Sequence, residues 1–151
     1  MEQLLPSAFG AVASLLEENA LLSSDIRPDD LRHFLGLRQH GSIVSVGGIQ
    51  VYGTLGLLRS IAVSSDLRGK GHGTEIVTRL EQYALGNGIL RLYLLTETAA
   101  DFFASLNYEA TARSRVPHTL RTTPQFAQLC PDTAVCMTKP LPLDPVLARR
   151  R

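Results

Sequence analysis

The chain has 151 residues, of which 44% are hydrophobic, and this length and composition suit one domain with a substantial core. Its 15 basic and 14 acidic residues leave a net charge of +1, which excludes the strong overall field of a protein that binds nucleic acid or an anionic membrane. No stretch approaches the roughly 20 apolar residues of a membrane helix. The start, MEQLLPSAF, is acidic and does not read as a signal peptide, so we expect a cytoplasmic protein.

Apolar runs broken by turn residues predict strands that alternate with helices along the chain. In chain order, the expected elements are a strand at 2–5, a helix at 7–19, a short helix from 28 toward 34, a hairpin of strands at 34–38 and 43–51, a strand at 57–63, a helix from 74 to Gly86, a strand at 89–96, a helix at 98–106, a strand that opens at Tyr108, and a last strand at 133–138. This order predicts an α/β protein with a mixed sheet.

Two features interrupt this pattern. The pair Gly47-Gly48 breaks the strand at 43–51, and it marks either a bulge or a place where a ligand approaches the backbone. The tail from Pro140 to Arg151 holds three prolines and three terminal arginines, and we expect it to be disordered. Residues 1–139 would then form the single domain.

The segment Arg68-Gly69-Lys70-Gly71-His72-Gly73 lies between the strand at 57–63 and the helix that opens at Thr74. Its glycines allow a tight turn and a close ligand, and the free N–H groups and positive dipole end of the helix point back into the turn. These properties predict a site for a pyrophosphate, with the two basic side chains at its rim. The segment lacks the Lys-Ser or Lys-Thr pair of a Walker A loop and the spacing of a dinucleotide fingerprint, but it fits R-x-x-G-x-G.

This motif resembles the acetyl-CoA pyrophosphate loop of the GNAT N-acetyltransferase superfamily. The longer segments YGTLGLLRSIAVSSDLRGKGHG, RLYLLTETAADFFASLNY and TTPQFAQLCPDTAVCMTKPL resemble the arsenic-resistance N-acetyltransferases. The stretch LLTETAADFF is also similar to the acetyltransferase domain of N-acetylglutamate synthases. The resemblance implies the GNAT acyl-CoA N-acyltransferase fold, an α+β arrangement around a mixed sheet, in which homodimers are common.

The resemblance further implies that acetyl-CoA is the co-substrate. The residues that it assigns to acetyl-CoA are Ile61, Ala62, Val63, Arg68, Gly69, Lys70, Gly71, His72, Gly73, Thr74, Thr96 and Phe103. Thr96 stands where the family often has asparagine. Phe103 stands where some members have a tyrosine that protonates the departing CoA thiolate, and phenylalanine cannot supply that proton.

Three arginines are the main candidates for binding the acceptor substrate. Strand alternation places Leu57, Arg59 and Ile61 on one face, which by resemblance looks toward the acceptor together with Ser60. Arg59 either clamps a substrate carboxylate or forms a structural salt bridge with Glu75 or Glu97. Arg113 and Arg115 alternate on the strand after Tyr108, where they supply a second anion contact or a solvated edge.

No glutamate base stands at Leu57, the position where some members carry one, so Glu97, His118 or an ordered water remains as the base. Cys130 and Cys136 are expected to be reduced, and their spacing matches no metal signature, so we expect no metal.

The resemblance implies acetylation of the α-amino group of a small acidic amino-acid-like substrate, with arsinothricin as the first choice. Two alternatives stay open: acetylation of glutamate, and a non-catalytic module that senses acetyl-CoA.

Overall fold

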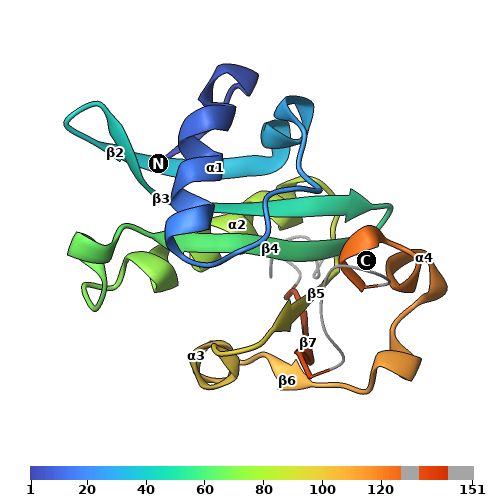
Figure 1. Cartoon of the computed structure of the whole chain (residues 1–151). Helices are drawn as coiled ribbons and strands as arrows, with labels where there is room; N and C mark the ends of the chain where they lie inside the picture. Colours follow the sequence, from blue (N-terminus) through green and yellow to red (C-terminus); the bar gives the residue numbers. More distant parts are fainter. Residues whose placement is uncertain (127–132, 143–151) are drawn as a thin grey trace.

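A seven-stranded mixed sheet in the order β1-β2-β3-β4-β5-β7-β6 organises the computed structural model, which describes residues 1–126 and 133–142 (Figure 1). The strands are β1 (Glu2–Gln3), β2 (Phe34–Gln39), β3 (Ser42–Tyr52), β4 (Leu55–Val63), β5 (Arg91–Thr96), β6 (Glu109–Ala110) and β7 (Val135–Pro140). The α-helices are α1 (Phe9–Glu18), α2 (His72–Gly86), α3 (Ala100–Ser105) and α4 (His118–Arg121), and the 3-10 helices are η1 (Pro6–Ala8), η2 (Pro28–His33), η3 (Ser65–Leu67) and η4 (Arg113–Arg115). The expected mixed sheet is confirmed. Among the described residues, no helix combines the length and apolar character needed to cross a bilayer.

Neighbouring strands run antiparallel except β4 and β5, which are parallel. Their register covers only Leu55–Leu57 against Arg91–Tyr93, after which the two strands diverge, as Figure 1 shows. β4 continues against β3 as far as Val63, and β5 continues against β7 as far as Thr96. The sheet therefore opens into a wedge between the C-terminal halves of β4 and β5.

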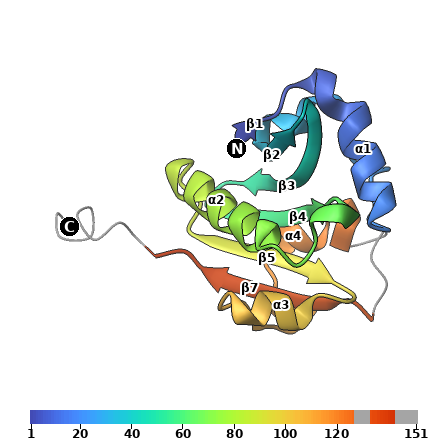
Figure 2. The ribbon, with the colours of Figure 1, turned by 90° about the vertical axis from the view of Figure 1, so that its left-hand side faces the viewer.

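Helices cover both faces of the sheet. In Figure 2, α2 and α3 lie in front of the sheet and α4 lies behind it. The apolar stripe of α2 is fully buried against the sheet, and burial of such side chains stabilises the fold by about 1.5–3 kcal/mol for each large aliphatic residue. On the opposite face, α1 packs around Phe34 and Val46, and the segment that contains α4 packs around Leu57 and Tyr93.

The glycines of β3 are explained by side-chain packing. A Cβ atom at Gly47 would lie 2.6 Å from the Ile61 side chain, and a Cβ atom at Gly48 would lie 2.4 Å from the ring of Phe34. The register between β3 and β4 also shifts at this point, so that Ser60 and Ile61 lie opposite Gly47 alone. Of the two interpretations left open by the sequence, the bulge is therefore confirmed.

One expectation for the C-terminal part is wrong. Arg113 and Arg115 do not lie on a strand, because β6 ends at Ala110 and the two arginines belong to the 3-10 turn η4. The last strand covers residues 135–140 rather than 133–138, and Leu141 is buried and donates its N–H to the carbonyl of Leu90 at 2.8 Å. The rest of the expected tail, residues 143–151, lies outside the described residues.

Candidate functional site

The wedge between β4 and β5 contains a cavity of about 500 Å³. Both halves of the sheet, the loop after α1, helix α3 and the segment before β7 contribute to its wall. The lining residues are Asn19, Ala20, Leu21, Leu22, Leu58, Arg59, Ser60, Ile61, Gly73, Leu94, Leu95, Thr96, Glu97, Thr98, Ala99, Phe102, Phe103, Gln125 and Ala134. A cavity of this size, apolar with a few polar groups, has the character of a small-molecule site.

Ser60 belongs to the cavity wall and has an unusual backbone conformation. Its φ of 61° is left-handed, a conformation that costs a non-glycine residue about 1–2 kcal/mol. The bulge reverses the alternation of β4, so that Ile61 packs with the α2 face whereas Leu57 packs on the opposite face. The expectation that Leu57, Arg59 and Ile61 share one face is therefore wrong.

Backbone groups of β4 line the wedge. Since the register with β5 ends at Leu57 and Tyr93, the side of β4 that faces the wedge has no strand partner from Leu58 to Val63 among the described residues. Unpaired N–H and C=O groups require partners. An extended ligand with amide groups can supply them in the manner of an added strand.

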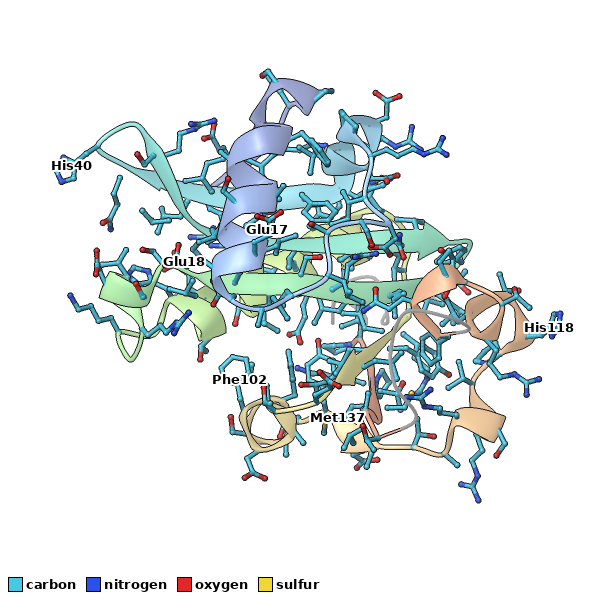
Figure 3. The ribbon with its side chains drawn as sticks, viewed as in Figure 1. Glu17, Glu18, His40, Phe102, His118 and Met137 are labelled. Carbon is cyan, nitrogen blue, oxygen red and sulfur yellow. The ribbon has the colours of Figure 1, made fainter. Side chains whose placement is uncertain are left out.

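The glycine-rich loop sits at the start of α2. Gly69 and Gly71 have φ values of 77° and 84°, and Gly71 is the N-cap of α2, where no side chain caps the first turn. The N–H groups of this turn therefore remain available for an anion. Gly73 reaches the cavity, and a Cβ atom there would lie 3.3 Å from the ring of Phe102, which Figure 3 shows above α3.

Two side chains of the same loop have distinct environments. Arg68 donates a hydrogen bond from Nη2 to Oδ1 of Asn19 at 2.9 Å, which ties the loop to the end of α1. His72 has a buried Nδ1 without a hydrogen-bond partner among the described residues. Lys70 and Thr74 are exposed.

Arg59 is held in the wall by a buried ion pair. Its Nη1 and Nη2 atoms donate to the two carboxylate oxygens of Asp25, the second at 2.7 Å, and its Nε donates to Oγ of Ser60 at 3.0 Å. The side chains of Arg59 and Asp25 are only 2% and 7% exposed. Arg59 therefore forms a structural salt bridge, but its partner is Asp25, and the expected partners Glu75 and Glu97 are wrong. The fork of the guanidinium is occupied, and two of its five N–H groups remain for another partner.

Three further expected residues line the opposite wall. Thr96 accepts a hydrogen bond from the N–H of Ala99 at 3.0 Å and so shapes the turn before α3. Phe103 is buried, with its ring 5.0 Å from that of Phe102 in an edge-on contact. Glu97 is exposed at the rim of the cavity.

The structure does not bring His118 and Arg115 to this site. Both side chains are exposed and neither lines the cavity, and Figure 3 shows His118 pointing outward from α4. Arg113 donates to the carbonyl of Ala134 at 3.2 Å. The helical turns η4 and α4 replace the expected strand, so the side-chain alternation that would have aimed these residues inward is lost.

Cys136 does not belong to the cavity lining. Cys136 is buried on β7, and burial raises the pKa of its thiol to about 11. Cys130 is outside the described residues. Within the described part of the chain, no three His, Cys, Asp or Glu side chains are grouped to hold a metal ion.

Sequence reasoning missed Asp25, Gln125 and the loop at residues 19–22. Asp25 pairs with a residue 34 positions away, and no local pattern reports such a contact. Gln125 lies in an irregular stretch between two prolines, where periodicity gives no signal.

Comparison with known proteins agrees with this geometry. The model of the acetyltransferase (GNAT) family matches residues 1–108. The chain is 28% identical over 109 residues to the amino-acid acetyltransferase of Ectopseudomonas mendocina, a match that covers 69% of this chain and 25% of that protein. The chain thus spans about a quarter of the length of the curated relatives that it matches.

Solved structures show the same fold. The chain is similar to Rv2747 from Mycobacterium tuberculosis in complex with CoA and NLQ, with a TM-score of 0.79, 21% identity, and coverage of 93% of this chain and 98% of that chain. It is also similar to N-acetylglutamate synthase from Neisseria gonorrhoeae complexed with coenzyme A and N-acetyl-glutamate, with a TM-score of 0.81, 19% identity, and coverage of 93% of this chain and 34% of that chain.

Proposed function

Because the chain belongs to the acetyltransferase (GNAT) family, we propose that it transfers the acetyl group of acetyl-CoA to the α-amino group of a small acidic amino-acid-like acceptor. The observation that carries this proposal is the cavity in the wedge, which joins an unpaired stretch of β4 backbone to the free N–H groups before α2. CoA has the matching chemistry, an extended arm with two amides joined to a pyrophosphate.

In this proposal the backbone binds most of the acetyl-CoA. The N–H groups between Gly69 and Thr74 hold the pyrophosphate, with Arg68 and Lys70 at the rim. The β4 backbone at residues 61–63 pairs with the pantetheine arm and donates to the thioester oxygen, which stabilises the negative charge of the tetrahedral intermediate. Phe103 packs against the arm.

The transfer itself is a direct attack. The acceptor ammonium loses one proton, and the neutral nitrogen then attacks the thioester carbon, so that a C–N bond forms and the C–S bond breaks. A second proton leaves the nitrogen and ends on the CoA thiolate. Of the two bases predicted from the sequence, Glu97 lines the cavity and His118 does not, so we assign the first proton to Glu97, directly or through water.

The acceptor would approach from the face opposite α2. The pyrophosphate loop occupies the α2 face, whereas Arg59 lies on the face that carries α1 and α4. The two guanidinium N–H groups left free by Asp25 and Ser60 can donate to an acceptor carboxylate. Two acceptors fit this chemistry: arsinothricin, from the three segments that resemble arsenic-resistance enzymes, and glutamate, from the similarity to amino-acid acetyltransferases.

CoA release, followed with a free-thiol reagent, tests the proposal. Acetyl-CoA is incubated with arsinothricin, phosphinothricin, glutamate or no acceptor. Turnover with arsinothricin alone identifies the detoxifying activity, and turnover with glutamate alone identifies the amino-acid acetyltransferase. Tight acetyl-CoA binding without turnover for any acceptor would refute catalysis and favour a sensor.

The role of Glu97 is tested by Glu97→Gln. We expect kcat/KM for the acceptor to fall at least about tenfold near pH 7, and the deficit to shrink at higher pH, where the amine is already neutral. The control is Asp101→Asn, which removes an exposed carboxylate of α3 outside the cavity lining. If Glu97→Gln kept the pH profile of the unaltered protein, solvent would be the base.

A further inference from the structure

Building on the function proposed above, we propose that Gln125 recognises the amine of the acceptor. Its side-chain oxygen Oε1 accepts a hydrogen bond from the attacking nitrogen. This contact would make Gln125 a specificity-determining residue that selects amino acids over their deamino analogues and orients the nitrogen toward the thioester.

The first observation is an unpartnered polar atom. Gln125 is only 9% exposed and lines the cavity, yet its Oε1 has no hydrogen-bond donor among the described residues. Buried polar groups in folded proteins are nearly always paired, because an unpaired one loses its hydration without compensation. This oxygen has less than 1 Å² of accessible surface in the free protein, so a donor that enters the cavity supplies the missing partner once the carboxamide turns about its terminal torsion.

The second observation is that the backbone around Gln125 is anchored. Thr123 is buried, donates from Oγ1 to the carbonyl of Leu120 at 2.7 Å, and accepts from the N–H of Phe126 at 3.5 Å. Leu120 and Phe126 belong to the apolar cluster around Leu57. The packing therefore fixes the backbone from which the Gln125 side chain reaches the cavity wall, as a recognition residue requires.

The third observation is the face from which Gln125 reaches the cavity. Its anchoring cluster lies on the α4 side of the sheet, whereas the pyrophosphate loop and α2 lie on the other side, as Figure 2 shows for the two helices. Gln125 shares its side of the sheet with Arg59, so the two residues flank the acceptor end of the cavity rather than the CoA end.

The chemistry at this end distinguishes the two groups of an amino acid. The charge of Arg59 is compensated by Asp25, but its remaining N–H groups can only donate, so they bind a carboxylate and not an ammonium. The orphaned oxygen of Gln125 requires a donor, and an amine nitrogen donates both when protonated and when neutral. Arg59 thus binds the carboxylate of a small acceptor and Gln125 binds its amine, because the first residue donates hydrogen bonds and the second accepts them.

The test uses the full-length protein and four variants. Gln125→Leu removes the amide at similar size, and Gln125→Glu keeps an acceptor oxygen. Gln50→Leu is the matched control, because Gln50 also has a buried, unpartnered Oε1 in the described structure but does not line the cavity. Thr123→Ala reports the effect of loosening the segment without touching the carboxamide. Turnover is measured for each amine of the panel above. Glutarate, which lacks the amine, is tested as a competitive inhibitor. The affinities for acetyl-CoA and for the amines are measured by calorimetry.

We expect Gln125→Leu to reduce kcat/KM for the amine about 10- to 100-fold, while its affinity for acetyl-CoA and its inhibition by glutarate change less than about twofold. Gln125→Glu is expected to stay within a few-fold of the unaltered protein, as is Gln50→Leu. The assignment would be overturned if Gln125→Leu weakened the binding of the amine and of glutarate equally. It would also be overturned if only the affinity for acetyl-CoA fell. Absence of turnover and of amine binding in the unaltered protein would refute the proposed function and this inference with it.

Discussion

Removal of the Asp25 carboxylate is expected to destabilise the protein severely. In the variant Asp25→Ala, the guanidinium of Arg59 would stay in the wall of the cavity without its counter-ion. The two side chains are 7% and 2% exposed, so water cannot replace the lost partner without a rearrangement of the loop after α1.

The magnitude follows from this burial. Breaking a buried ion pair by removal of one partner typically costs about 3–5 kcal/mol, because the remaining charge is uncompensated. A domain has about 5–15 kcal/mol of stability in total. Asp25→Ala should therefore lose roughly a fifth or more of the free energy of unfolding, and its urea midpoint should fall accordingly.

Urea denaturation followed by circular dichroism measures the effect. The control is Glu2→Ala, which breaks the pair between Arg38 and Glu2, whose side chains are 45% and 50% exposed. Exposed pairs contribute about 0–1 kcal/mol, so this variant should unfold almost as the unaltered protein does.

A double variant completes the argument. Asp25→Leu combined with Arg59→Met removes both charges, and it should recover much of the stability that Asp25→Ala loses. If Asp25→Ala proved as mild as Glu2→Ala, the pair would be solvated in solution, and the reasoning from burial would be refuted.

Two further predictions concern the loop before α2 and the buried thiol. Gly71→Ala should cost about 1–2 kcal/mol, since φ is 84° there, and should weaken acetyl-CoA binding in calorimetry, whereas Gly10→Ala, in open space on α1, should do neither. An unchanged acetyl-CoA affinity in Gly71→Ala would contradict the pyrophosphate assignment. Burial raises the pKa of Cys136 from 9 to about 11, so in a Cys130→Ala background this thiol should resist a disulfide reagent at pH 8. Stability should fall as pH rises from about 9 to 11, because the unfolded chain releases the thiol proton first; rapid labelling of the folded protein at pH 8 would contradict this.

Local patterns predicted the parts of the site that depend on neighbouring residues. The loop from Arg68 to Gly73 and the helix after it follow from glycine spacing and apolar periodicity within a few residues, and both occur where expected, with α2 starting two residues earlier at His72. The wedge beside β4 depends instead on where pairing with β5 ends, and the paired residues, such as Leu57 and Tyr93, are 36 positions apart in the chain.

Errors arose where distant contacts decide the local conformation. The bulge at Ser60 depends on Gly47 of the neighbouring strand, so alternation alone placed Ile61 on the wrong face. Arg113 alternates with Arg115 as it would on a strand, but β7 pairs with β6 only through Ala110, and the chain then turns into η4.

The short register between β4 and β5 has a mechanical consequence. The strands β1 to β4 form one half of the sheet and β5, β7 and β6 form the other, and the register between β4 and β5 joins them through three residue pairs. A ligand that pairs with the open edge of β4 and also contacts β5 would link the two halves of the sheet where their strands diverge. Amide hydrogens of Leu94 and Leu95 should then exchange more slowly when acetyl-CoA is bound, so that acetyl-CoA would stiffen the cavity wall that the acceptor contacts.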